Sequence, residues 1–236
     1  MASSSKKSSD SRRVKVDELR AQQKAAERKR SLIFVGIAVV VGLGLIAAAA
    51  IPIIQRNMEA DKALAEFGVS AADAGCGEVQ DDAAEGVGDH VGPGTEFPGT
   101  TRVEYTTSPP SSGQHFAQTA GFDRHFYGRS DIPILEELVH NLEHGYTIVW
   151  FDEEVSDDDV ATLEALADRV SADVPKFIVS AWDSDDRGAF PEGHIAIAHW
   201  TDGTGHRMYC ERPSGEVIDD FMTQFPYTDS PEPNAI

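Results

Sequence analysis

The stretch VHNLEHGYTIVWF, residues 139–151, carries a helical pattern into a strand pattern across one glycine. YTIVWF, residues 146–151, is apolar and rich in β-branched and aromatic residues, which is typical of a buried strand. Gly145 suits the end of a helix because glycine adopts the left-handed conformation at little cost. We therefore expect a helix over 131–144 and a strand directly after it. Apolar residues recur at helical spacing before the glycine, at Ile134, Leu135, Leu138, Val139 and Leu142.

Similar patterns continue on both sides of this stretch. Ser156, followed by three aspartates, predicts a helix start because it can cap the first turn while the acids suit the helix dipole. Strands separated by helices and long loops indicate an α+β fold with a mostly antiparallel sheet and flanking helices. We assign this domain to residues 75–228, with a loop-rich entry over 75–100 and a flexible tail over 229–236. The other expected elements are strands at 101–107, 176–182 and 194–200, a short edge strand at 206–210, and helices at 156–170 and 214–225.

A long apolar run, LIFVGIAVVVGLGLIAAAAIPII, occupies residues 32–54 and contains no charged side chain. As a helix at ~1.5 Å per residue it would reach about 35 Å, enough to cross a hydrocarbon core of ~30 Å. A cleaved signal peptide is the alternative, since small residues follow at 47–50, but the run is long for one. We expect a retained transmembrane helix, preceded by a basic segment over 1–31 and followed by a juxtamembrane helix over 55–74.

Charge is distributed unevenly along the 236 residues. The formal net charge is −20, yet residues 1–30 hold ten Lys/Arg against four Asp/Glu. Positive charge before the apolar run predicts a cytoplasmic N-terminus and an extracytoplasmic C-terminal domain, anchored in the cell membrane by a single pass. The strongly acidic outer domain argues against nucleic acid as a partner.

The chain has two cysteines, Cys76 and Cys210, and both lie on the expected outer side. In an oxidising compartment such a pair predicts one disulfide. Two free thiols, or a thiolate metal ligand at Cys210, are the alternatives. The disulfide would close a long loop, for which chain entropy gives roughly 4–5 kcal/mol of stabilisation.

A pair of histidines stands out in the opening stretch. His140 and His144 are four residues apart in the expected helix, so their side chains share one face, as in many zinc and copper sites. His115 is the best third ligand because it follows a Pro-Pro turn and a glycine. The alternative is that the pair only stabilises the helix end. Further ligands to consider are His90, His125, His199, His206 and Met208, the last of which would favour copper(I).

Residues 140–144 also match H-x-x-E-H, the inverted zincin signature. In such hydrolases two histidines hold zinc and the glutamate acts on a zinc-bound water. Gly145 argues against a hydrolase, because it ends the helix where the motif needs the helix to continue. A further alternative is a metal-free cluster of hydrogen bonds, within a module that docks on another membrane protein.

Three motifs resemble an uncharacterised bacterial membrane-protein family, domain of unknown function 3105. They are YTTSPPSSGQH at residues 105–115, LVHNLEHGYTIVWF at 138–151, and a PEP sequence after the last helix. The resemblance extends over residues 70–233. It departs from the family pattern at His199, where a small residue is usual, and in the segment AGFDRHFY at 120–127.

The resemblance implies a single-pass membrane protein with an extracytoplasmic domain and no assigned activity. It supports the disulfide, because many members carry a cysteine pair at the places of Cys76 and Cys210. It also implies that the histidines of the first two motifs form one site, for copper or zinc. The expected site comprises the metal ligands His115, His140 and His144 and the supporting residues Glu143, Tyr105 and Ser112.

Overall fold

The computed structural model describes residues 35–36, 39–45, 48 and 63–235 of the chain. Contacts divide the chain into two compact units, Met1–Met58 and Glu59–Ile236. In the first unit the described residues are helical and almost all exposed. Across the described ranges, no helix is both long enough and apolar enough to span a bilayer. The expected basic segment and most of the expected transmembrane segment lie outside the described residues.

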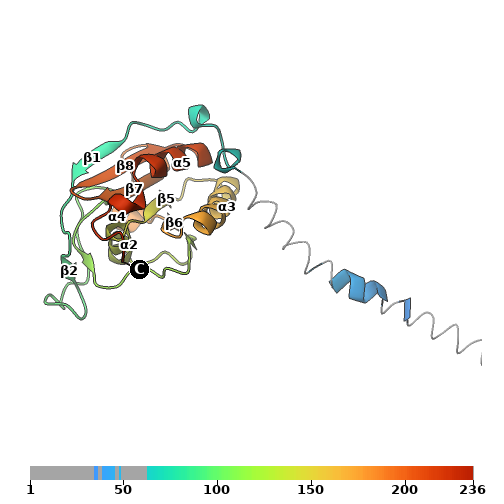
Figure 1. The fold of residues 1–236 in the computed structure, drawn as a ribbon, viewed down its shortest axis with the longest axis horizontal. Coiled ribbons are helices and arrows are strands. Elements are labelled where there is room, and N and C mark those ends of the chain that lie inside the picture. Colours follow the sequence, from blue (N-terminus) through green and yellow to red (C-terminus); the bar gives the residue numbers. More distant parts are fainter. Residues whose placement is uncertain (1–34, 37–38, 46–47, 49–62, 236) are drawn as a thin grey trace, which may run out of the picture. The chain divides into compact units, whose positions relative to one another are not determined.

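A six-stranded sheet forms the centre of the second unit (Figure 1). Its strands are β1 (Gln80–Ala83), β4 (Phe126–Tyr127), β5 (Thr147–Phe151), β6 (Phe177–Ala181), β7 (Ile195–Thr201) and β8 (Thr204–Cys210). They are arranged in the order β1-β8-β7-β5-β6-β4. The pairs β1–β8, β8–β7 and β7–β5 are antiparallel, whereas β5–β6 and β6–β4 are parallel. The fold is therefore α+β with a mostly antiparallel sheet, which confirms this part of the sequence analysis.

Helices cover both faces of the sheet. α3 (Asp157–Asp173) and α5 (Gly215–Gln224) pack on the face that receives Val149 and Phe151 of β5. α2 (Leu135–Glu143) packs on the opposite face, with Ile148 and Trp150. Because alternate side chains of a strand point to opposite faces, burial of β5 on both requires apolar side chains at consecutive positions, as at residues 148–151. The short α4 (Ser184–Arg187) lies in the loop between β6 and β7.

The junction between α2 and β5 forms as the opening stretch predicts. α2 ends at Glu143, and Gly145 follows with a φ of 92°. A Cβ at Gly145 would lie 2.6 Å from the carbonyl oxygen of Tyr227. Glycine is therefore needed here both for its backbone conformation and for the close approach of the C-terminal segment.

Other segments differ from the sequence-based expectations. Residues 101–107, expected as a strand, form no regular element. The strand expected at the sheet edge over 206–210 is β8, which lies inside the sheet between β1 and β7. The edge on that side is β1, within the segment expected to be loops, and its sequence QDDA lacks the apolar alternation that would reveal a strand. Within the described part of 55–74, the chain forms two short 3₁₀ helices, Leu64–Glu66 and Ala71–Asp73.

A disulfide joins Cys76 and Cys210 across 134 residues, which confirms the predicted pairing. Cys76 precedes β1, and Cys210 ends β8, the strand with which β1 pairs. The Gly77 N–H also donates to the Tyr209 carbonyl oxygen at 2.9 Å. The covalent bond therefore fastens an edge strand to the strand beside it.

The segment expected as a flexible tail makes contacts with the rest of the domain. It contains the end of a 3₁₀ helix, Tyr227–Asp229. The Lys176 ammonium donates to the carbonyl oxygens of Pro233 and Ala235, at 2.8 and 2.9 Å, and to that of His144, at 2.6 Å. These hydrogen bonds hold residues 233–235 beside the residue that follows α2.

Candidate metal centre

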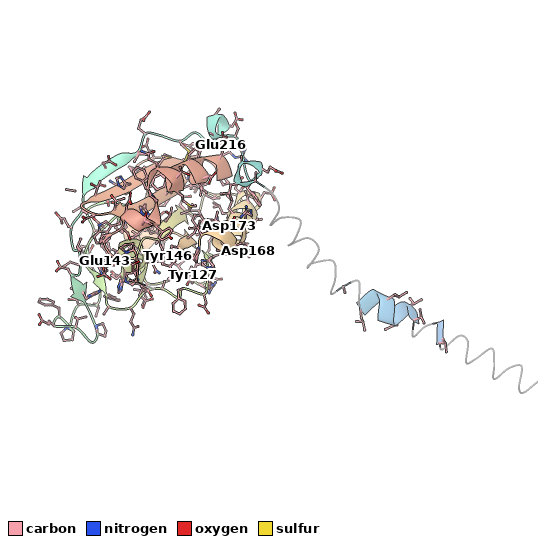
Figure 2. The ribbon with its side chains drawn as sticks, in the orientation of Figure 1. Tyr127, Glu143, Tyr146, Asp168, Asp173 and Glu216 are labelled. Carbon is pink, nitrogen blue, oxygen red and sulfur yellow. A yellow bond between two sulfur atoms is a disulfide. The ribbon has the colours of Figure 1, made fainter. Side chains whose placement is uncertain are left out.

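The buried end of α2 supplies two potential metal ligands. His140 and Glu143 are 6% and 0% exposed. They lie three residues apart, so they share one face of the helix. Figure 2 labels Glu143 in this part of the domain. The helix contacts β3 (His115–Phe116), which brings a third candidate side chain to the same place.

Two histidines come from a small parallel sheet that contains β3. Its other strand is β2 (His90–Val91), and the register sets His90 opposite His115. Gly113 precedes β3 with a φ of 141°, and a Cβ there would lie 2.8 Å from the Tyr105 ring. The glycine after the Pro-Pro turn therefore allows the chain to approach closely enough to place His115 in the interior.

Three imidazoles and one carboxylate converge at this point. Nε2 of His90 lies 3.4 Å from Nε2 of His140, and Nε2 of His115 lies 3.0 Å from Oε2 of Glu143. The ring centroids of His115 and His140 are 4.7 Å apart. One potential ligand atom from each of the four residues lies within 4.8 Å of the others. We call these four residues the His3Glu group.

Backbone groups orient two members of the His3Glu group. Nδ1 of His115 lies 2.8 Å from the Gly113 carbonyl oxygen, which can only accept, so Nδ1 carries the proton. In the neutral ring, Nε2 then bears a lone pair. The Gly88 N–H donates to Oε1 of Glu143 at 2.6 Å, which aims Oε2 at His115.

The contact between His115 and Glu143 has the distance of an ion pair but not the direction of a hydrogen bond. Their facing atoms are buried, and neither has a hydrogen-bond partner among the described residues. Two acceptors that face each other in a low-dielectric interior repel. A second proton on His115, or a metal ion between the two atoms, would remove this repulsion.

The protonation states suit metal binding. Burial lowers the pKa of His140 to about 4, and the nearby rings of His115, His144 and His90 add to the effect. Burial raises the pKa of the Glu143 carboxyl, but a hydrogen bond and the positive charge from His115 in its cationic form, together with the bond from Gly88, outweigh it, so the net pKa is lowered. Near pH 7, His140 is therefore neutral and Glu143 ionised, which are the forms that bind metals.

His144 belongs to a second group of potential ligands. Its ring centroid lies 4.4 Å from that of His140, as expected for residues four apart at a helix end. Its Nε2 lies 3.5 Å from Oε2 of Glu232. Potential ligand atoms of Glu143, His144 and Glu232 lie within 4.8 Å of one another. The structure thus brings His115 and His140 into one group and His144 into the next, with Glu143 common to both.

The expected supporting residues Tyr105 and Ser112 act on the turn before β3. The Tyr105 hydroxyl donates to the Gln114 carbonyl oxygen at 2.8 Å. The Ser112 hydroxyl accepts from the Glu85 N–H at 3.3 Å. Both contacts stabilise the backbone that carries His115, and Glu143 is supported instead by Gly88.

A hollow of about 420 Å³ borders the His3Glu group on the side of His90. Gly88, Phe97 and Gln114 also line it. His90 is half-buried, whereas His115 is fully buried. The hollow therefore gives an ion a way to reach the group from solvent.

Sequence reasoning ranked His90 below His115 and did not single out Glu232. His90 has no motif around it, and Glu232 is the acid of the PEP sequence, which pointed to a family but to no role. Met208 packs on the opposite face of the sheet, with the cluster around α3 and α5. The other candidates contact different partners: His125 the Phe177 carbonyl, His199 the Tyr146 carbonyl and His206 the Asp81 carboxylate.

Comparison with known proteins gives one match. A family model described as "Protein of unknown function (DUF3105)" matches residues 97–236. No curated protein and no solved structure matches the chain. The matched range includes His115, His140, Glu143 and Glu232, and it begins after His90.

Proposed function

The chain belongs to the DUF3105 family of proteins of unknown function, and from its geometry we propose that its folded domain binds a divalent transition metal. The ligands in this proposal are His90, His115, His140 and Glu143. Relative to the site expected from the sequence, His90 takes the place of His144. Glu143 binds the metal directly rather than through another residue.

Two distances carry the proposal. In a tetrahedral site with bonds of about 2.0–2.2 Å, two ligand atoms are about 3.3–3.6 Å apart. The atoms that face each other are 3.4 Å apart in the pair His90–His140 and 3.0 Å apart in the pair His115–Glu143. Each pair therefore has nearly the separation that two bonds to one ion require, and the potential ligand atoms of all four residues lie within 4.8 Å of one another.

The donor set favours zinc(II), with copper(II) as the second choice. Imidazole and carboxylate suit both ions, whereas copper(I) selects thiolate and thioether ligands. The two cysteines form a disulfide, and Met208 lies on the other face of the sheet. Neither the cysteines nor Met208 can therefore serve as the soft ligands that copper(I) selects.

The test is zinc affinity of the purified full-length chain, measured by competition with a chromophoric chelator. The apo protein should bind zinc(II), and His115→Gln and His140→Gln should each weaken binding at least about 100-fold, because each removes a direct ligand. His194→Gln is the matched control, since His194 has a side chain that is 42% exposed and bonds Asp152 instead. Thermal unfolding of each apo variant checks that the fold is retained.

The metal-free alternative makes a different prediction. If the four residues form only a structural cluster, the wild-type chain binds neither zinc(II) nor copper(II) above the level of a nonspecific protein. His115→Gln would then lower the unfolding temperature without changing any metal content. This result would overturn the proposal and leave a buried hydrogen-bonding cluster in an interaction module.

We also propose that this domain is held at the outer side of the cell membrane by the apolar segment 32–54. The disulfide supports an oxidising compartment. Exposed apolar side chains on the described helical residues support contact with lipid, at Val35, Val39, Val40, Val41, Leu43 and Leu45. External protease should digest the domain in intact cells, and complete protection there, with digestion after lysis, would contradict this orientation.

A further inference from the structure

We propose that the domain holds a second divalent ion through Glu143, His144 and Glu232, with the Glu143 carboxylate bridging the two ions. This inference rests on the metal site proposed above. It explains why one buried carboxylate belongs to both groups of potential ligands.

Glu143 is placed to serve two ions. Its side chain is fully buried, and Oε2 has no hydrogen-bond partner among the described residues. An ionised carboxylate offers about four lone-pair sites on two oxygens, so the bond from Gly88 leaves sites for two ions. Ions in two-metal sites lie about 3.5–4 Å apart. The rings of His140 and His144, one from each group, lie side by side, with centroids 4.4 Å apart.

Glu232 is brought to this place by the backbone around it. Its N–H donates to the Glu143 carbonyl oxygen at 3.0 Å. Lys176 binds the next carbonyl, that of Pro233, together with the carbonyl of His144. The segment that carries Glu232 is therefore fixed to the same helix end that carries the other two ligands. Its carboxylate faces His144 across 3.5 Å, a gap that an ion can bridge.

The two ions would differ in their exposure to solvent. The side chains of His115 and Glu143 are 0% exposed, whereas that of Glu232 is 45% exposed. The first ion is thus bound by four residues in the interior and the second by three residues near the surface. The second ion is therefore expected to bind more weakly and to exchange faster.

The experiment measures zinc stoichiometry of the full-length chain by equilibrium dialysis at buffered free zinc(II). The wild type should take up one equivalent at low free zinc and a second at higher free zinc. Glu232→Gln should retain the first and weaken the second at least about tenfold, because it removes a charged ligand of the outer ion alone. X-ray absorption of the two-zinc form should show zinc–zinc scattering at about 3.5–4 Å, and Glu232→Gln should lose it.

Glu164→Gln is the matched control, since Glu164 is an exposed acid on α3, which packs on the opposite face of the sheet. It loses the same charge and should bind two equivalents like the wild type. Unfolding temperatures of both apo variants should equal that of the wild type within about a degree or two, given that surface substitutions change stability little.

The outcomes separate the two proposals. One equivalent in the wild type, with no effect of Glu232→Gln, would overturn the second ion and leave the first. A second equivalent that persists in Glu232→Gln with unchanged affinity would also overturn it. No zinc in the wild type would overturn the metal site itself, and the second ion with it.

Discussion

At the scale of single residues, the carbonyl of Gly113 decides the chemistry of His115. It holds the proton on Nδ1 and so leaves Nε2 as the atom that faces Glu143. A metal-bound histidine commonly donates its second ring nitrogen to a backbone carbonyl, and that partner fixes the ring orientation. The backbone around Gly113 is therefore part of the site, although it contributes no ligand.

Gly86→Ala should disturb this backbone without removing any ligand. Gly86 has a φ of 78°, and a Cβ there would lie 2.3 Å from the carbonyl carbon of Gly113. We expect a loss of about 2 kcal/mol or more in the free energy of unfolding, from the left-handed backbone and the clash together. Zinc affinity should also fall, because Gly88 and Gly113 both move. Denaturant titration and chelator competition measure the two effects.

Gly203→Ala separates the clash from the backbone conformation. Gly203 has a φ of 85° in the turn between β7 and β8, and no atom lies within 4 Å of a Cβ built there. Its substitution should cost about 1–2 kcal/mol and leave zinc affinity unchanged. Equal zinc affinities for the wild type and Gly86→Ala would show that the turn does not position the site.

His199 should make the stability of the domain depend on pH. Burial lowers its pKa to about 4 from an ordinary value of 6.5. Below pH 6.5 the unfolded chain gains a proton that the folded chain does not accept until about pH 4. Stability is therefore fully present above pH 6.5 and is lost as the pH falls towards 4, by up to about 3 kcal/mol for this residue.

Urea unfolding between pH 7.5 and 4.5, in the presence of a chelator, measures this dependence. His140, whose pKa is also lowered to about 4, contributes with the same sign. His199→Asn should therefore make the free energy of unfolding depend less steeply on pH. His194→Asn should not do so, because the hydrogen bond with Asp152 raises the pKa of His194 and its contribution is lost as the pH rises. Identical slopes for the wild type and His199→Asn would contradict this account.

The sequence could predict part of the site at this scale. Helical spacing placed the rings of His140 and His144 side by side, and the Pro-Pro turn with its glycine pointed to His115. Spacing alone could not show that His144, which follows the last residue of α2, faces Glu232. Nor could it show His90, because that residue reaches the group through the pairing of two two-residue strands.

At the scale of elements, capping and apolar patterning predicted the helices and strands that form the core. α3 begins after Ser156, whose hydroxyl accepts from the Asp159 N–H at 3.2 Å. β5 and β7 are apolar because the sheet is covered on both faces. β1 and β2 escaped prediction because β1 is polar and β2 is only two residues long, and tertiary pairing alone makes them strands.

Ser156→Ala should lower stability without affecting the metal site. Loss of the cap leaves an N–H of the first turn unsatisfied, for a cost of about 1 kcal/mol. Zinc affinity should stay the same because α3 and α2 pack on opposite faces of the sheet. Ser156→Asp, which can also cap, should restore most of the stability. A parallel loss of zinc affinity in Ser156→Ala would mean that the two faces are coupled.

At the scale of the whole domain, the folded unit extends beyond the matched family range. That range begins at residue 97, yet Cys76, β1 and His90 precede it and contact the sheet or the site. The disulfide was predictable from two cysteines and an expected oxidising compartment. The contact between the C-terminal segment and the end of α2 was not predictable, because it depends on long-range hydrogen bonds such as those of Lys176.

Breaking the disulfide should destabilise the domain by about 2–5 kcal/mol, since it closes a loop of 134 residues in the unfolded chain. Urea unfolding of the Cys76→Ser/Cys210→Ser double variant measures the loss. Zinc affinity should fall less than on removal of a ligand, because β1 remains paired with β8 through its backbone. Reductant should destabilise the wild type and leave the double variant unchanged; the same response in both would indicate an effect unrelated to this bond.

The contact between Glu232 and the end of α2 has a consequence for the order of events during synthesis. A ribosome makes the chain from its N-terminus, so the residues of the His3Glu group emerge before β7, β8 and the C-terminal segment. Glu232 is the last donor to arrive. An ion bound by the nascent domain would therefore be enclosed only when the C-terminal segment folds. Its release from the finished protein would begin with dissociation of the segment that carries Glu232.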